Sequence, residues 1–159
     1  MDSVWLPEAS ATEQLGSALA HSAPWSATGA LIVYLEGELG SGKTTLARGL
    51  LQALGVTEAV RSPTYTLIES YEFGPRRVLH LDLYRLVGSQ ELEALALRDE
   101  LGGGAMALIE WPERAQPALP PPDLRVQLEW ADPGRRARLQ PVGEPGGAWL
   151  QAAERLFQK

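Results

Sequence analysis

The sequence predicts an α/β fold in which a mixed, partly parallel sheet is flanked by helices. Over the first two thirds of the chain, short apolar runs typical of buried strands alternate with segments of helical periodicity. A glycine-rich segment joins the first buried run, residues 30–35, directly to a helical segment. Two pairs of strand-like segments separated by turn residues add antiparallel parts, so the sheet is expected to be mixed.

The glycine-rich segment, residues 37–44, matches the phosphate-binding pattern G-x-x-x-x-G-K-[ST] at every fixed position. Before it, residues 30–35 form an apolar run rich in β-branched residues, which is typical of a strand buried on both faces. After it, residues 45–54 carry leucines at four-residue spacing and end at Gly55, as an amphipathic helix does. This strand, loop and helix together predict the three-layer fold of P-loop NTPases.

The other elements follow from caps, periodicity and turn residues. Ser10 and Glu13 have the spacing of a capping box, which predicts a helix from Ser10 to about His21. The remaining expected elements are a strand at 64–71, a turn at 74–75, a strand at 78–84, a helix at 90–101 capped by Ser89, and a strand at 105–110. Beyond the proline-rich residues 117–122 we expect a hairpin of strands 124–130 and 136–142, then a helix with Trp149, Ala153, Leu156 and Phe157 on one face.

Composition limits the classes of function. The 159 residues are expected to form a single domain, and the absence of cysteine excludes disulfides and thiolate chemistry. No apolar run is long enough to span a membrane and no secretory segment is visible, so a cytoplasmic protein without a membrane partner is expected. A net charge of −6 argues against direct, tight tRNA or other RNA binding by this chain alone.

The phosphate loop predicts which groups would bind a nucleotide. Backbone amides of Gly40, Ser41, Gly42, Lys43, Thr44 and Thr45 would face the phosphates at a helix N-terminus, where the helix dipole favours anions. The Lys43 ammonium would reach the terminal phosphates, and the Thr44 hydroxyl would be offered to Mg²⁺. Lys43 is one of only two lysines beside twelve arginines, which suggests that a compact ammonium is required there.

Acidic residues end two of the predicted strands. Asp82 and Glu110 are both candidates to hold Mg²⁺ or to orient an attacking water, and periodicity does not separate the two roles. Thr64, in Ser-Pro-Thr after the loop helix, is a candidate sensor of the terminal phosphate, with ordinary turn chemistry as the alternative. His80 is interpreted as a satisfied core histidine, with a supporting role behind a carboxylate as the alternative. Trp111 either packs or has a role at the site, where it would stack on a base or close the site.

The ordered motifs resemble the TsaE family, the small ATPase of the bacterial machinery that makes threonylcarbamoyladenosine on tRNA. They are the phosphate loop with Leu35-Glu36 before it, Ser62-Pro63-Thr64-Tyr65, His80-Leu81-Asp82-Leu83-Tyr84-Arg85 and Ile109-Glu110-Trp111-Pro112-Glu113. The similarity covers roughly residues 10–115 and is loose beyond residue 120. Glu38 and Ser41 depart from the Asp and Ala often found in the family, at positions whose side chains the phosphates do not require.

The resemblance implies a Mg²⁺-dependent ATPase, weak alone and stimulated by its partners TsaD and TsaB, which it drives or resets between turnovers. By motif, Lys43 and Thr44 bind phosphates and Mg²⁺, Thr64 senses the terminal phosphate, and Asp82 and Glu110 form the metal and water-orienting pair. Trp111 becomes a functional candidate. Weaker local similarity places Thr12 near the adenine and makes Arg135 a nucleotide contact.

Two other classes of function share the phosphate loop. A small-molecule kinase would need an acceptor pocket and usually an arginine-bearing lid, which is not apparent before Glu110. A nucleotide-responsive binding module needs no hydrolysis. A GTPase is excluded because its guanine-reading motif requires a lysine, and the lysines lie only at positions 43 and 159.

Overall fold

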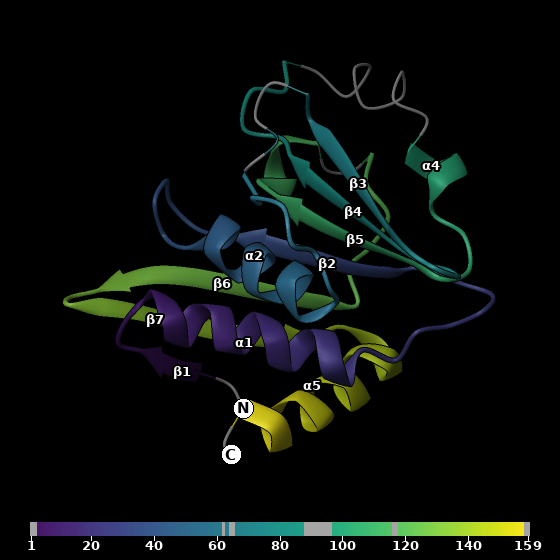
Figure 1. The fold of residues 1–159 in the computed structure, drawn as a ribbon. Helices are drawn as coiled ribbons and strands as arrows, with labels where there is room; N and C mark the ends of the chain where they lie inside the picture. Colours follow the sequence, from purple (N-terminus) through teal and green to yellow (C-terminus); the bar gives the residue numbers. More distant parts are fainter. Residues whose placement is uncertain (1–2, 62, 64–65, 88–96, 116–117, 158–159) are drawn as a thin grey trace.

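The computed structural model describes residues 3–61, 63, 66–87, 97–115 and 118–157. They form one seven-stranded sheet in the order β1-β7-β6-β2-β5-β4-β3, with helices on both faces (Figure 1). The strands are β1 Ser3–Leu6, β2 Leu31–Glu36, β3 Ile68–Phe73, β4 Arg76–Asp82, β5 Ala105–Glu110, β6 Leu124–Ala131 and β7 Gly134–Pro141. The helices are α1 Ala9–Ser22, α2 Lys43–Ala53, α4 Leu97–Glu100, the 3₁₀ turn η1 Pro112–Arg114, and α5 Gly143–Phe157.

The predicted α/β class with a mixed sheet is confirmed. Strand β2 pairs in parallel with β5 and β6, and β5 pairs in parallel with β4. The expected hairpins are the antiparallel pairs β3–β4 and β6–β7. Every side chain of β5 is buried, as the continuous apolar run from residue 105 predicted.

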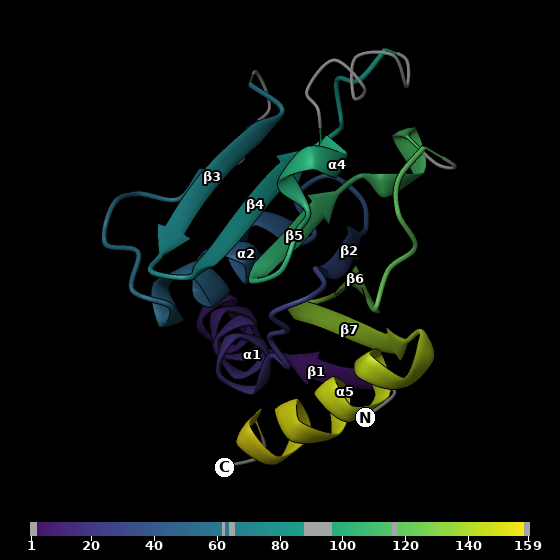
Figure 2. The ribbon, with the colours of Figure 1, turned by 90° about the vertical axis from the view of Figure 1, so that its right-hand side faces the viewer.

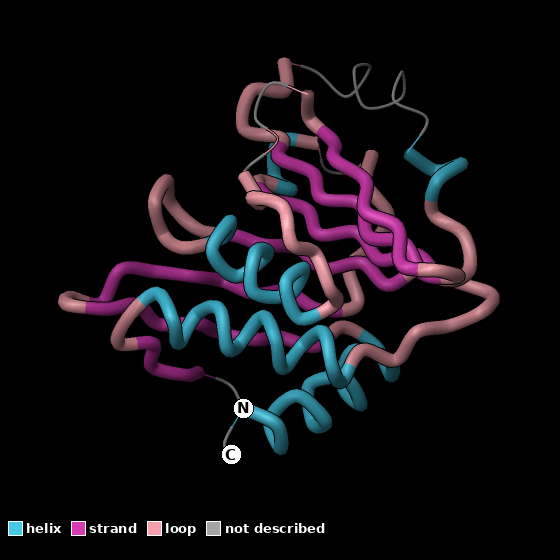
Figure 3. Tube along the Cα trace, in the orientation of Figure 1, coloured by secondary structure: helices cyan, strands magenta, loops and turns pink. Residues whose placement is uncertain are grey.

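One face of the sheet holds a core of leucines and valines under α1, α2 and α5. Figures 1 and 3 show α1 and α2 side by side across the sheet, with α5 beside α1. Trp149 of α5 is fully buried and donates its indole N–H to the carbonyl of Leu19 at 3.0 Å, which docks α5 on α1. The opposite face is covered by α4 and the segment around η1, through Leu97 and Ala115 (Figure 2).

Several predicted boundaries were wrong. Helix α1 begins at Ala9 with Glu8 as its N-cap and no side-chain cap, so Ser10 lies inside the helix and not at its start. Leu156 was expected on the buried face of the last helix but is 41% exposed. Leu150 is buried there instead, with Trp149 and Ala153. Strand β3 begins at Ile68. Of the predicted helix at 90–101, residues 90–96 lie outside the described residues, and residues 97–100 form α4. Strand β1 was not predicted at all; it pairs with β7 at the edge of the sheet.

In the part of the chain that the structure describes, no helix is both long and apolar enough to cross a membrane.

Candidate nucleotide-binding site

The phosphate loop leaves β2 and enters α2 through glycines that hold positive φ angles. Gly40 has φ +78° and Gly42, the N-cap of α2, has φ +109°. An L-residue adopts these conformations at a cost of roughly 1–2 kcal/mol, which explains glycine at both positions. Helix α2 begins at Lys43, so its first amides have no partner within the helix and are available to an anion. In Figure 1 this loop lies at the carboxyl end of β2, where α/β proteins bind ligands.

Lys43 is buried behind the loop that it would serve. Its ammonium donates to the carbonyls of Gly37 at 2.6 Å and Glu38 at 2.9 Å, and it lies 4.3 Å from the centre of the Trp111 ring. Burial lowers the pKa of Lys43 below 10.5, although the charges of Glu110 and Asp82 act in the opposite direction. The lysine therefore already shapes the loop with two of its three donors.

Thr44 is joined to the carboxylate of Glu110 across the space between α2 and β5. The Thr44 hydroxyl lies 3.0 Å from Oε1 and 3.1 Å from Oε2 of Glu110, so it is shared between both oxygens. Glu110 is only 2% exposed, and its Oε2 also lies 2.6 Å from Nε2 of His80. His80 is therefore a buried core histidine whose Nε2 has a partner, and that partner is one of the two candidate carboxylates. Its position two residues before Asp82, on the same face of β4, is what made the supporting role an alternative in the sequence.

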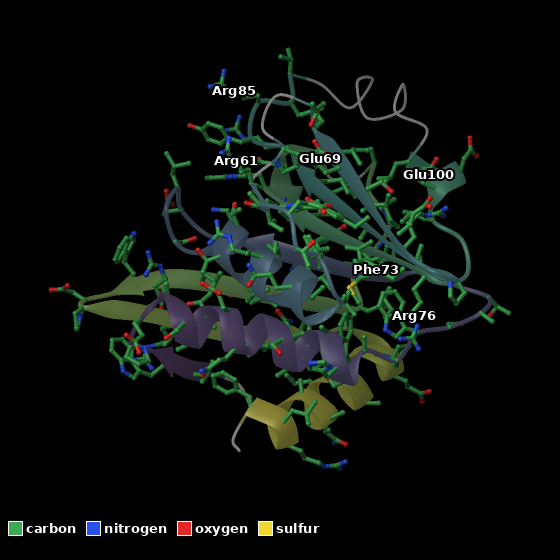
Figure 4. All side chains as sticks on the ribbon, viewed as in Figure 1. Arg61, Glu69, Phe73, Arg76, Arg85 and Glu100 are labelled. Carbon is green, nitrogen blue, oxygen red and sulfur yellow. The ribbon has the colours of Figure 1, made fainter. Side chains whose placement is uncertain are left out.

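Asp82 ends β4 next to Glu110, with which it is paired in the register of the two parallel strands. It is 5% exposed, and its Oδ1 accepts the backbone N–H of Tyr84 at 3.0 Å. That hydrogen bond holds the chain as it turns out of the strand. Figure 4 shows Arg85 beyond this turn, pointing away from the sheet.

Trp111 directly follows Glu110 and has φ +60° and ψ +49°, a conformation uncommon for a large side chain. Its ring lies 5.0 Å from that of Tyr84, in addition to its contact with the Lys43 ammonium. The Arg114 guanidinium lies over both rings, 5.3 Å from Tyr84 and 5.8 Å from Trp111. These contacts fix the indole at the wall of the site.

Arg135 reaches the phosphate loop from the start of β7. Its guanidinium donates to the carbonyl of Gly40 at 3.1 Å and lies 4.1 Å from the centre of the Trp130 ring. A side-chain carbon placed on Gly42 would come 3.1 Å from Cδ of Arg135 and 3.7 Å from Cγ2 of Thr12. Thr12 and Arg135 therefore meet at Gly42, although the chain separates them by more than a hundred residues.

A cavity of about 380 Å³ brings most of the predicted site residues together. Its lining includes nine of the twelve, namely Gly40, Gly42, Lys43, Thr44, Thr45, Asp82, Glu110, Trp111 and Arg135. Ser41 and Thr12 do not line it: both are almost fully buried beside the loop, and their hydroxyl oxygens have no hydrogen-bond partner among the described residues. Thr64 lies outside the described residues. Tyr84 and Arg85 line the cavity and were not predicted as site residues.

The residues at this cavity fit a magnesium ion that arrives with a nucleotide. Mg²⁺ prefers oxygen ligands and is usually held by one or two carboxylates together with substrate phosphates. Thr44, Glu110 and Asp82 supply such oxygens at the N-terminus of α2. Across the described residues, no group of three or more His, Asp or Glu side chains could hold a metal ion.

Known proteins share both the sequence and the fold. The profile of the family described as Threonylcarbamoyl adenosine biosynthesis protein TsaE matches residues 6–138. A protein of Haemophilus influenzae named tRNA threonylcarbamoyladenosine biosynthesis protein TsaE is 46% identical over 110 residues, which is 69% of this chain and 70% of that protein. A protein of the same name from Nostoc sp. is 40% identical over 146 residues, covering 89% and 86% of the two chains.

The crystal structure of Bacillus subtilis YdiB superimposes with a TM-score of 0.71 at 27% identity, covering 98% of this chain and 93% of that one. Its similarity extends past residue 120, where the sequence motifs are loose. The family profile covers five sixths of the chain, including the phosphate loop, both carboxylates and Arg135. The chain belongs to the TsaE family.

Proposed function

We propose that this chain binds ATP in the cavity at the phosphate loop and hydrolyses it in a Mg²⁺-dependent reaction. The observation that carries the proposal is the group formed by Lys43, Thr44 and Glu110, in which a buried ammonium and a hydroxyl shared with a carboxylate meet at a helix N-terminus. P-loop proteins use these groups to bind phosphates and magnesium. The relatives' names support a role of the reaction in forming threonylcarbamoyladenosine on tRNA.

Each residue of the cavity has its own role in the hydrolysis. Lys43 holds the terminal phosphates as a point charge, while the first amides of α2 bind phosphate oxygens. Thr44 and Glu110 would hold Mg²⁺, because their oxygens already lie 3.0 Å apart. When bound, Mg²⁺ neutralises the charge that develops on the phosphate oxygens. Asp82, next to Glu110 in the register, orients the attacking water.

Other residues bind the rest of the nucleotide and close the site. Trp111 covers Lys43 and limits access of water to the terminal phosphate. Arg135 holds the Gly40 carbonyl and contacts the nucleotide. Thr12 lies near the adenine, as the family resemblance implies, with its Cγ2 close to Gly42. Thr64 senses the terminal phosphate, as the family resemblance implies.

The hydrolysis serves a complex with the family's partners TsaD and TsaB, which it drives or resets between turnovers. This chain does not bind tRNA tightly by itself, because its net charge is −6 and phosphate backbones are bound by basic surfaces. It acts in the cytoplasm, where the tRNA is modified.

The test is phosphate release from ATP by the purified chain, alone and mixed with TsaD and TsaB, with and without Mg²⁺. We expect slow release alone and strong stimulation by the partners, lost in Lys43→Ala. Phosphorylation of a small acceptor would identify a kinase instead. Binding of ATP without hydrolysis under any condition would leave a nucleotide-responsive binding module.

A further inference from the structure

His80 contacts the carboxylate at the centre of the proposed site although it does not line the cavity. It is fully buried on β4, and its Nε2 lies 2.6 Å from Oε2 of Glu110 on the neighbouring strand β5. A distance this short between a ring nitrogen and a carboxylate oxygen is typical of a charge-assisted hydrogen bond. Glu110 is thus held from two sides, by Thr44 of α2 and by His80 of β4.

The hydrogen-bond partners decide which atom donates. Both oxygens of Glu110 lie within hydrogen-bonding distance of the Thr44 hydroxyl, which donates to them. Nδ1 of His80 is buried and has no hydrogen-bond partner among the described residues. A proton on that atom would be a buried, unsatisfied donor, whereas a proton on Nε2 points at a carboxylate. The proton therefore belongs on Nε2.

We propose that His80 is a positioning residue for magnesium, which holds the Glu110 carboxylate toward Thr44 through an Nε2–H donor. The proposal rests on the magnesium part of the proposed function. A carboxylate that ligates a metal is commonly oriented by such a second hydrogen bond, and its loss typically costs about 10–100-fold in metal affinity or activity. Without His80, the Glu110 side chain loses the bond that fixes Oε2.

The alternation of side chains along β4 places two residues of one short segment at the site. Side chains two residues apart on a strand point to the same face, so His80 and Asp82 both project toward α2. His80 braces Glu110 from within the core, while Asp82 lies at the cavity wall. The segment from His80 to Asp82 therefore supplies both a cavity carboxylate and the support of the other one.

Two substitutions at His80 separate a positioning role from simple packing. His80→Gln keeps an N–H donor on a side chain long enough to reach Oε2, and His80→Leu fills similar space without a donor. The matched control is Leu79→Val, which perturbs the buried residue next along β4 on the opposite face of the sheet. Each variant is compared per folded molecule, after its thermal unfolding has been measured.

The decisive readout is binding of a fluorescent, non-hydrolysable ATP analogue with Mg²⁺ and with EDTA. Mg²⁺ is expected to raise the affinity of the wild type for the analogue. We expect this gain to be about tenfold or more smaller in His80→Leu, with the affinity in EDTA unchanged. His80→Gln should recover most of the loss, and Leu79→Val should bind like the wild type. Equal magnesium dependence in His80→Leu and the wild type would overturn the proposal, as would equal losses in the Leu and Gln variants.

The protonated nitrogen can be read directly by NMR of ¹⁵N-histidine. The chain has only two histidines, and the other, His21, is exposed on α1, so a His21→Gln background leaves His80 as the one labelled ring. A protonated Nε2 is expected. A deprotonated Nε2 would overturn the proposal, because Glu110 would then be the donor.

The two proposals fail in different ways. If the wild type hydrolyses no ATP with its partners but magnesium-dependent binding still needs His80, the proposal of hydrolysis is refuted and the role of His80 is supported. If hydrolysis is strong and His80→Leu binds magnesium and nucleotide normally, only the role of His80 falls. A wild-type affinity that Mg²⁺ does not change would overturn both the metal assignment and the role of His80.

Discussion

The packing of α1 against α2 makes a strong prediction at Gly16. A side-chain carbon placed on Gly16 would lie 2.2 Å from the carbonyl oxygen of Leu46 and 2.8 Å from the amide nitrogen of Leu50, both backbone atoms of α2. Gly49 of α2 meets α1 in the same way, 2.2 Å from the carbonyl oxygen of Glu13. The two helices cross where each has a glycine. Because α2 begins with Lys43, this crossing also positions the phosphate loop.

We expect Gly16→Ala to destabilise the protein even though alanine is the better helix former. Alanine gains about 1 kcal/mol over glycine inside a helix. Overpacking a core typically costs about 1–3 kcal/mol, and here the atoms struck are backbone, which cannot rotate away. The helices would have to separate by roughly 1 Å to restore ordinary contact. Because backbone atoms are struck, we take the upper end of that range, about 3 kcal/mol; subtracting the gain of about 1 kcal/mol leaves a net loss of about 2 kcal/mol.

Urea unfolding at equilibrium measures the difference, with the slope checked for constancy. The matched control is Gly147→Ala in α5, where an added carbon would meet nothing within 4 Å. That substitution should stabilise by up to about 1 kcal/mol, through helix propensity and a less flexible unfolded chain. Opposite signs at the two glycines support the close crossing. If Gly16→Ala were as stabilising as Gly147→Ala, α1 and α2 would not meet at Gly16.

Three further predictions concern the site and its support. Glu110→Ala and Asp82→Ala should each lose Mg²⁺-dependent phosphate release by on the order of 100-fold or more, and near-normal partner-stimulated release in both would contradict their roles. Because burial lowers the pKa of Lys43, affinity for ATP should fall as the pH rises toward 10.5, and a nucleotide titration that stays flat to that pH would contradict a buried ammonium at the phosphates. Burial also raises the pKa of Asp123, whose carboxylate accepts the Ile32 amide at 2.8 Å. Asp123→Asn keeps an acceptor without the charge, so it should hardly change the stability measured by thermal unfolding. Asp123→Ala should cost about 1–3 kcal/mol, because the Ile32 amide loses its partner. Equal stability of the two variants would show that this hydrogen bond does not stabilise the protein.

The parts of the fold that sequence predicts well are those whose signal is local. The strand at residues 105–110 has the predicted ends, because glycines mark where its apolar run begins and a charged residue marks where it stops. The phosphate loop is equally local, since its glycines are required by the backbone conformation of the loop itself. Helix ends are predicted less well. Ser10 has capping-box spacing, yet α1 begins one residue earlier, at Ala9, with Glu8 as its N-cap and no side-chain cap.

The missed features depend on partners far along the chain. Strand β1 has only four residues, which is too short for a periodic pattern to predict it. It forms by pairing with β7, more than 120 residues away. The supporting role of His80 was an alternative in the sequence, but its partner, Glu110, depends on the register of two strands, which the sequence does not show. Leu156 follows the helical period of α5 but is 41% exposed, and Leu150 is buried beside Trp149 and Ala153 instead.

Trp111 shows where the fold accepts local strain near the site. A bulky residue at φ +60° costs on the order of 1–3 kcal/mol and persists only where its surroundings hold it. Here Tyr84 and the Lys43 ammonium hold the ring, and Pro112 follows with its own fixed backbone. A relaxed, extended residue at this position would continue the line of β5 and carry the indole away from Lys43. The unusual conformation is thus what places an aromatic wall beside the ammonium, directly after the carboxylate that Thr44 and His80 hold.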